Sequence, residues 1–155
     1  MQEEELQLVI FRLKNEEFGV NIHQTQEIIK KPEITRVPNA PSFVEGVINL
    51  RGRIIVVIDL NKRLGLEVEG RDENSRIIIV EVDSEVVGML VDAVTEVLRI
   101  PKSNIETAPS LVASQINIEY LQGVGKLKDR LLILLDLNKI LSEEEIKQLK
   151  QAEML

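Results

Sequence analysis

Residues 43–64 read FVEGVINLRGRIIVVIDLNKRL, and residues 120–141 read YLQGVGKLKDRLLILLDLNKIL. Aligned without gaps, the two stretches share nine identical residues, and most of the other pairs exchange one apolar side chain for another. The identical pairs are Gly46/Gly123, Val47/Val124, Leu50/Leu127, Arg53/Arg130, Asp59/Asp136, Leu60/Leu137, Asn61/Asn138, Lys62/Lys139 and Leu64/Leu141. Because chance does not readily produce nine such matches, we interpret the chain as one structural unit written twice.

The repeat extends upstream of these two stretches. Residues 17–22 and 26–29 match residues 86–91 and 95–98 in pattern, at a shorter spacing than the downstream block. The second copy therefore carries an insertion, which we expect in the polar residues 101–117. Two copies are too few for a solenoid, whose stacked units need at least three to bury a continuous core. The pattern predicts a pseudo-symmetric pair of small β units.

Composition limits the class of protein. A chain of 155 residues is the size of one domain, and each half is near the size at which a separate core becomes marginal. We therefore expect the halves to pack on each other or to share a strand. The 44% of apolar residues exclude a disordered chain. No apolar run approaches the roughly 18 residues of a membrane span, and the acidic start is unlike a signal peptide, so we expect a cytoplasmic protein.

The charge and the metal-binding side chains exclude further classes. There is no cysteine and His23 is the sole histidine, which excludes disulfides, thiolate sites and structural zinc. We expect no metal and no cofactor. A formal net charge of −7 argues against nucleic acid, whose binding depends on clustered Lys and Arg. The expected partner is another protein.

Hydrophobic alternation predicts the strands. Residues 6–14 with 18–22, and residues 77–82 with 86–91, read as two β-hairpins. Residues 26–30 and 95–100 read as a third strand in each copy, although propensity alone does not separate them from a helical turn. Pro32, Pro38 and Pro41 predict a loop over residues 32–42, because each lacks an amide donor. Gly52 between two β-rich runs predicts a tight hairpin turn.

Each unit is thus predicted to contain five short strands and a turn of helix. Such strands favour a small closed or nearly closed barrel, because closure removes exposed sheet edges. The predicted subdomains are residues 7–66 and 76–141, joined by a linker at 67–75. A capping box at Ser142 and Glu145 predicts an amphipathic C-terminal helix over residues 142–153.

Few residues suggest catalysis. Asp59 and Asp136 could form an acid/base pair across the pseudo-twofold axis, but each precedes Leu-Asn-Lys, so we favour the capping of a helical turn. His23 has no sequence partner and reads as a surface residue. Arg51 at the hairpin tip is either a solvated turn residue or an interface anchor, and the sequence leaves both open.

Residues 34–60, ITRVPNAPSFVEGVINLRGRIIVVIDL, resemble the signature of the CheW coupling proteins of bacterial chemotaxis. Gly88 with Leu90-Val91-Asp92, the region of Pro109, and residues 120–125 followed by LILLD at 132–136 fit the same family in order and spacing. The resemblance covers essentially the whole chain. One departure is Val56, where many members have proline.

The resemblance implies two packed SH3-like five-stranded barrels and a non-enzymatic adaptor, monomeric when free. The adaptor joins the cytoplasmic hairpin tips of transmembrane chemoreceptors to the regulatory domain of the histidine kinase CheA, at the inner face of the membrane and without insertion into it. The implied receptor contacts are Val9, Ile22, Thr25, Glu27, Ile28, Arg51, Val94 and Thr95. The implied kinase contacts are Val37, Pro38, Phe43, Arg53 and Ile55.

Three alternatives remain. Each groove aliphatic could belong to the core instead of the interface, whereas Glu27 is the safer interface residue because an acid in an apolar strand should face outward. The chain could also serve as a CheW-like scaffold of a non-flagellar pathway, or as a small β-barrel enzyme that uses Asp59 and Asp136.

Overall fold

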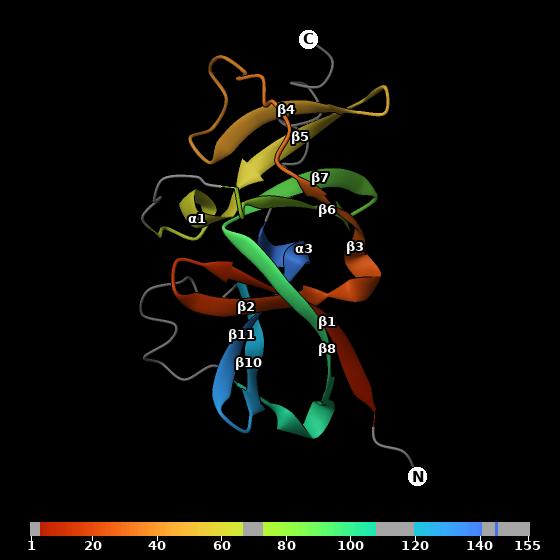
Figure 1. Ribbon diagram of the computed structural model, residues 1–155, viewed down its shortest axis with the longest axis vertical. Coiled ribbons are helices and arrows are strands. Elements are labelled where there is room, and N and C mark those ends of the chain that lie inside the picture. The colour runs from red at the N-terminus through yellow and green to blue at the C-terminus, as the bar shows by residue number, and fades with distance from the viewer. Residues whose placement is uncertain (1–3, 67–72, 108–119, 141–144, 146–155) are drawn as a thin grey trace.

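The computed structural model describes residues 4–66, 73–107, 120–140 and 145, which form two β-sheets stacked along the long axis of the molecule (Figure 1). The six-stranded sheet has the order β8-β1-β2-β11-β10-β9, with β8 (Ala93–Pro101), β1 (Glu5–Leu13), β2 (Glu16–Asn21), β11 (Arg130–Leu135), β10 (Leu121–Leu127) and β9 (Ile105–Glu106). The five-stranded sheet has the order β3-β6-β7-β5-β4, with β3 (Thr25–Lys30), β6 (Arg76–Val82), β7 (Glu85–Val91), β5 (Arg53–Asp59) and β4 (Val44–Leu50).

Four short helical segments complete the described fold. The 3-10 turns η1 (Ile22–Gln24) and η2 (Lys102–Asn104) lead into β3 and β9. The single-turn helices α1 (Leu60–Arg63) and α3 (Leu137–Ile140) follow β5 and β11. Among the described residues, no helix is long and apolar enough to cross a membrane.

The two halves of the chain exchange their hairpins. The β1–β2 hairpin of the first half pairs with β8 and, in parallel, with β11 of the second half. The β6–β7 hairpin of the second half pairs with β3 and, in parallel, with β5 of the first half. The expected sharing of strands is therefore observed, but the sheets do not follow the predicted boundaries at 7–66 and 76–141. Each sheet combines one half's hairpin with the other half's remaining strands.

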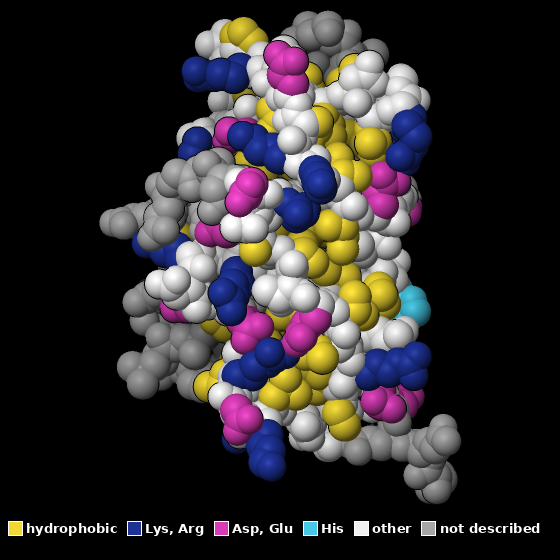
Figure 2. All heavy atoms as spheres, viewed as in Figure 1, with side chains coloured by type: hydrophobic (Ala, Val, Ile, Leu, Met, Phe, Trp, Pro, Cys, Tyr) yellow, Lys and Arg dark blue, Asp and Glu magenta, His cyan; other side chains and the backbone are white. Residues whose placement is uncertain are grey.

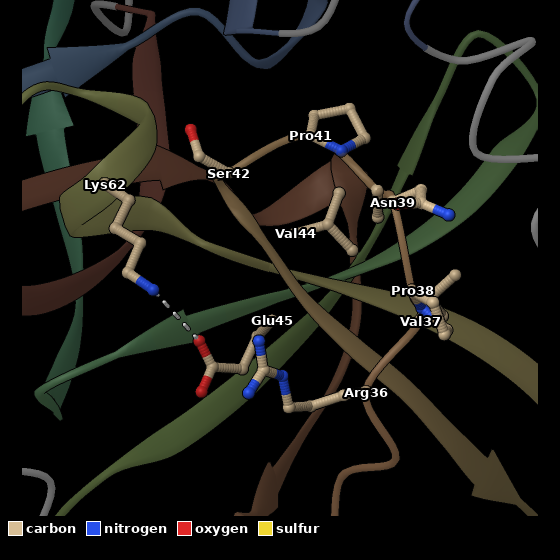
Figure 3. Close-up of a pocket in the computed structure, with 10 residues that line it drawn as sticks. Arg36, Val37, Pro38, Asn39, Pro41, Ser42, Val44, Glu45 and Lys62 are labelled. Carbon is tan, nitrogen blue, oxygen red and sulfur yellow. Dashed lines mark ion pairs between the residues drawn. The ribbon is translucent and has the colours of Figure 1, made fainter.

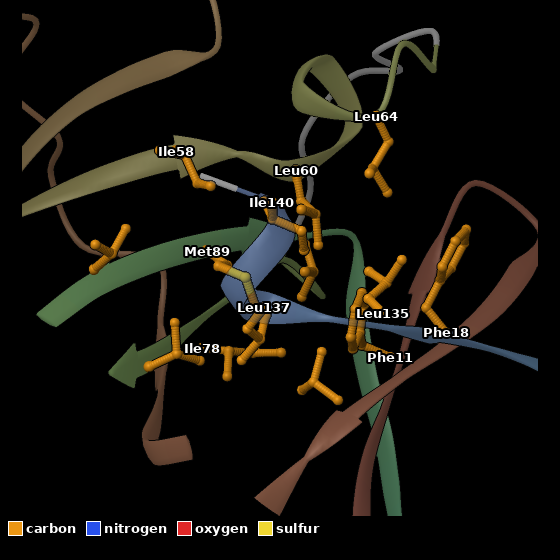
Figure 4. Packing of buried hydrophobic residues seen from close by; sticks show 14 of the residues in the cluster. Phe11, Phe18, Ile58, Leu60, Leu64, Ile78, Met89, Leu135, Leu137 and Ile140 are labelled. Carbon is orange, nitrogen blue, oxygen red and sulfur yellow. The ribbon is translucent and has the colours of Figure 1, made fainter. Parts of the chain in front are cut away.

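The middle parts of the hairpin strands are buried on both faces, which explains why apolar residues follow one another there without alternation. In β6, Ile77 and Ile79 face a small core inside the five-stranded sheet, whereas Ile78 and Val80 face the central core between the sheets. Figure 4 shows part of the central core, into which Leu60, Leu137 and Ile140 project from α1 and α3. The central core consists of Val9, Phe11, Leu13, Phe18, Val20, Phe43, Val56, Ile58, Leu60, Leu64, Ile78, Val80, Val82, Val87, Met89, Val91, Leu135, Leu137 and Ile140.

The glycines of the repeated motif sit where a side chain cannot fit. Each lies at a register shift, in β4 between Val44 and Gly46 and in β10 between Leu121 and Gly123. A Cβ on Gly46 would lie 2.2 Å from the carbonyl oxygen of Thr35, and one on Gly123 would lie 2.7 Å from that of Glu106. The neighbouring chain thus approaches each bulge at the same point, which accounts for this identity between the copies.

Most of the predicted elements are confirmed. Both third segments are strands, β3 and β8, and the hairpin turn has positive φ at Arg51 (51°) and Gly52 (84°). The mainly β fold with two units is confirmed as well. In the described residues the outer strands of a sheet are not hydrogen-bonded to each other, so closure into barrels stays a prediction. The predicted helix at 142–153 lies outside the described residues except for Glu145.

Candidate functional site

The hairpin turn between β4 and β5 reaches across to β3 through an ion pair. Arg51 Nη2 donates to Glu27 Oε2 at 2.5 Å and Arg51 Nη1 donates to Glu27 Oε1 at 3.2 Å, so the guanidinium fork binds the carboxylate through both oxygens. The hydrogen bond from Arg51 lowers the pKa of Glu27, and the same bond raises the pKa of Arg51. Arg51 is therefore neither free in solvent nor buried: its side chain is 71% exposed and held by Glu27.

A pocket of about 300 Å³ lies beside this ion pair, and we call it the β3 pocket. Its lining residues are Gln26, Glu27, Leu50, Arg51, Gly52, Arg53 and Ile55. Ile28, the next residue on β3, is 38% exposed but does not line this pocket, because successive side chains of a strand point to opposite faces of the sheet. Figure 2 shows one face of the molecule, on which hydrophobic side chains reach the surface down the middle, between charged groups of both signs.

The other predicted receptor contacts lie near the junction of the two sheets. Ile22 and Val94 are half-buried and pack against the same central core from η1 and from the start of β8. Thr25 Oγ1 donates to the carbonyl oxygen of Asn21 at 3.4 Å, and the exposed Thr95 donates to that of Ile10 at 3.3 Å. These four residues therefore border the places where the chain passes from one sheet to the other.

Three predicted contact residues are buried in the core of the free protein, and their role as partner contacts stays a prediction. Val9 is 1% exposed, Ile55 is 2% exposed and Phe43 is 8% exposed. Val9 and Ile55 lie on strands that are covered on both sides, so an apolar residue points inward on either face, whereas Phe43 lies in the turn before β4. Val9 and Phe43 support the surface from beneath, whereas Ile55, although 2% exposed, also lines the β3 pocket.

The predicted kinase contacts do not lie together. Val37 and Pro38 line a second pocket, of about 580 Å³, which we call the loop pocket. Arg53 instead lines the β3 pocket beside Glu27. The two pockets share no lining residue.

The loop pocket is formed by residues 36–42, the beginning of β4 and one residue of α1 (Figure 3). Lys62 Nζ lies 3.9 Å from Glu45 Oε2, and Figure 3 shows Lys62 and Arg36 extending toward Glu45 from different sides. Sequence reasoning missed this group, because Lys62 read only as part of the repeated Asp-Leu-Asn-Lys motif. The sequence feature that could have indicated this group was Arg36, a positive charge in a chain of net negative charge.

Arg63 joins the two halves, and the sequence analysis missed it as well. Its Cζ lies 4.7 Å from the ring centre of Phe43 and 5.2 Å from that of Tyr120. Its Nε donates to the carbonyl oxygen of Ile140 at 2.6 Å, and its Nη2 donates to Glu145 Oε1 at 2.8 Å. Phe43 and Tyr120 are repeat equivalents, as are Arg63 and Ile140, so this cluster lies at the pseudo-twofold axis.

The second half carries a related ion pair. Arg130 Nη2 donates to Glu96 on β8, and Arg130 Nη1 lies 3.6 Å from Glu17 Oε2 on β2. The hydrogen bond to Glu96 raises the pKa of Arg130. The large exposed apolar side chains among the described residues also pair by the repeat, Ile28 with Val97 and Ile54 with Leu131.

The duplicated aspartates cap helical turns, as predicted. Asp59 Oδ1 accepts a hydrogen bond from the backbone amide of Lys62 at 3.3 Å, and Asp136 Oδ1 accepts one from the amide of Asn138 at 3.1 Å. Asp59 is also 1% exposed, which removes it from contact with solvent. Their geometry favours a structural role over acid/base chemistry.

Comparison with known proteins gives one consistent result. Residues 7–145 match the model of the CheW-like domain family. The chain is 41% identical over 140 residues to chemotaxis protein CheW of Klebsiella aerogenes, covering 90% of this chain and 84% of that protein. It is 34% identical over 142 residues to chemotaxis protein CheW of Helicobacter pylori, covering 92% and 85% of the two chains.

A solved structure agrees in fold. The crystal structure of the scaffolding protein TtCheW from Thermoanaerobacter tengcongensis superposes with a TM-score of 0.84 at 38% identity, covering 92% of this chain and 96% of the other. Sequence and fold thus lead to the same assignment, and the chain belongs to the CheW family of chemotaxis proteins.

Proposed function

We propose that this protein couples transmembrane chemoreceptors to the histidine kinase CheA, as a cytoplasmic adaptor recruited to receptor complexes at the inner face of the membrane. Its family is one of chemotaxis scaffolds and adaptors, and its relatives include a protein described as scaffolding. The observation that carries the proposal is the presence of two surface pockets with no shared lining residue on one small β fold. Two pockets allow two partners to be bound at once.

The receptor side of the proposal rests on the β3 pocket and on apolar side chains that lie outside its lining. The cytoplasmic tip of a receptor is expected to bury Ile28 and the half-buried Ile22 and Val94, a non-directional contribution of about 25 cal/mol per Å² of apolar surface. The Glu27–Arg51 pair sets the orientation of the bound receptor. A charged side chain of the receptor must either bind beside this pair or replace one of its two members.

The kinase side rests on the loop pocket, where Val37 and Pro38 are proposed contacts. Arg53 remains a proposed kinase contact, and it borders the β3 pocket, so the two partners would approach each other at the β4–β5 hairpin. The adaptor then acts by holding its two partners in a defined arrangement. It changes kinase activity only as far as it binds one state of the kinase more tightly than another.

Calorimetric titration of the protein with a receptor hairpin fragment and, separately, with the kinase regulatory domain tests this function. Ile28→Asp is expected to weaken binding of the receptor fragment and spare the kinase, whereas Val37→Asp does the reverse. Leu131→Asp is the matched control, because Leu131 is 58% exposed in the other sheet. Failure of the unmodified protein to bind either partner would overturn the proposal, as would equal loss of both partners in both variants.

A CheW-like scaffold of a non-flagellar pathway is the second candidate. It uses the same surfaces and differs only in the receptors and kinase it joins. The small β-barrel enzyme using Asp59 and Asp136 has little support, because both carboxylates cap backbone amides.

A further inference from the structure

The loop pocket has rigid walls. Pro38 and Pro41 restrict the backbone of the loop, and the carbonyl oxygen of Pro41 accepts a hydrogen bond from the amide of Val44 at 2.9 Å. Asn39 holds a positive φ of 64° at the tip. A ligand would therefore meet a preformed surface and would not have to order the loop.

The charges in the pocket are not balanced. Two cations, Arg36 and Lys62, face one carboxylate, Glu45, in a chain whose net charge is −7. The Lys62–Glu45 separation of 3.9 Å is long, since the Arg63–Glu145 pair has 2.8 Å and the Lys126–Glu106 pair has 2.9 Å. Over the described part of the chain, Arg36 takes part in no ion pair, so both cations retain donors for an incoming anion.

From this we infer that the loop pocket binds a carboxylate side chain, an Asp or Glu, presented by the protein partner that docks on residues 36–45. Arg36 and Lys62 donate to it, while Val37, Pro38 and Val44 offer apolar contact for its methylene groups. One carboxylate balances the excess single positive charge. A phosphate dianion would add a second negative charge beside Glu45, which disfavours it. This assignment rests on the proposed function, which makes the kinase regulatory domain that partner.

Removing a positive charge from the loop pocket and removing its negative charge should have opposite effects on the binding of the kinase regulatory domain. Lys62→Gln and Arg36→Gln remove a donor but keep the size of the side chain roughly constant, and each is expected to weaken binding of the kinase regulatory domain about three- to tenfold. Glu45→Gln removes the competing acid and is expected to tighten binding. The affinity of the Lys62 variant should also depend less on salt than that of the unmodified protein.

Calorimetric titration with the kinase regulatory domain at low and moderate salt tests these effects. Lys128→Gln is the matched control, because it makes the same change in net charge at the exposed tip between β10 and β11. Circular dichroism checks that each variant is folded. Equal binding by the Lys62→Gln and Lys128→Gln proteins, or weaker binding by Glu45→Gln, would overturn the inference while the proposed function stands. No binding by the unmodified protein would overturn both.

Discussion

Gly46 and Gly123 show how a single residue can fix a point of the fold. Gly46 has a φ of 152° and its Cα faces the carbonyl oxygen of Thr35, so the position excludes any Cβ. Asp59 and Asp136 fix a point differently, by accepting backbone hydrogen bonds at the start of α1 and α3. These roles are local, and the repeat in the sequence marks all four residues.

Gly46→Ala is expected to lower the free energy of unfolding by about 2–4 kcal/mol, from backbone strain and the clash with Thr35. Gly52→Ala is the control, since Gly52 has a φ of 84° but no atom lies within 4 Å of the position that a Cβ would take there, and a loss of about 1 kcal/mol is expected. Urea denaturation followed by circular dichroism measures both. A loss at Gly46 no larger than that at Gly52 would contradict the steric explanation.

The Glu27–Arg51 pair predicts a pH dependence at acid pH. Because Arg51 lowers the pKa of Glu27 below its ordinary value of 4.5, the pair stabilises the folded protein above that pH. The contribution is lost as the pH falls through the lowered pKa. Arg51→Gln is therefore expected to raise the pKa of Glu27 toward 4.5, as measured by NMR titration of its carboxyl carbon. Added salt should reduce the difference between the proteins, because Arg51 is exposed and Glu27 is partly exposed to solvent. A Glu27 carboxyl that titrates at 4.5 in both proteins would refute the pairing.

Sequence reasoning identified some site residues and failed for others for a physical reason. Caps and turns depend on residues within three positions of each other, so Asp59, Asp136 and Gly52 were predictable. The burial of Val9 and Ile55 was not predictable, because strands covered on both faces give no alternation that separates core from surface. The Arg63 contacts were not predictable either, since they join residues far apart in the chain.

At the scale of elements, α1 and α3 meet at the pseudo-twofold axis through Arg63. The guanidinium lies between two aromatic rings and donates to the carbonyl oxygen of Ile140, while its side chain is 16% exposed. Low exposure strengthens both the ring contacts and the ion pair with Glu145. The Arg63 side chain therefore connects α1 of the first half to Ile140 and Glu145 of the second half.

Arg63→Ala is expected to lower the free energy of unfolding by about 2–3 kcal/mol, from the lost cation–π and hydrogen-bond contacts. Arg63→Lys should recover part of this, because an ammonium can lie over a ring but lacks the planar fork. The control is Arg12→Ala, at an exposed position on β1. Urea denaturation checks the order of the three proteins, and equal stability of the Arg63→Ala and Arg12→Ala proteins would rule out the proposed role.

The existence of the strands was predictable, but their partners were not. Both halves carry the same pattern of hairpin, third strand and second hairpin, so the sequence fits pairing within a half and pairing between halves equally well. In the structure the strands pair between halves: β2 pairs with β11, and β7 pairs with β5. Glycines mark both contacts: Gly19 pairs with Leu134 and Gly88 pairs with Val57.

At the scale of the whole molecule, the exchange of hairpins makes the two sheets depend on each other. Without the second half, β1 and β2 lose β8 and β11, and the apolar side chains of Leu8 and Ile10 become exposed. The complete chain is therefore expected to unfold in one cooperative transition.

Separated fragments test this dependence. Residues 1–72 and residues 73–155, expressed alone, are each expected to lack the dispersed NMR amide spectrum of a folded β protein. An equimolar mixture should regain it, because each fragment supplies the hairpin that the other needs. A folded spectrum from residues 1–72 alone would show that the halves are independent units.

The exchanged hairpins also bear on how the protein is made. The β1–β2 hairpin leaves the ribosome before the other described strands, yet β11, which lies beside β2, ends only at Leu135. During synthesis these two strands therefore keep apolar faces uncovered until β11 has been translated. Folding of this protein is in this sense a late event, and the nascent hairpin is the segment that chaperones would need to protect.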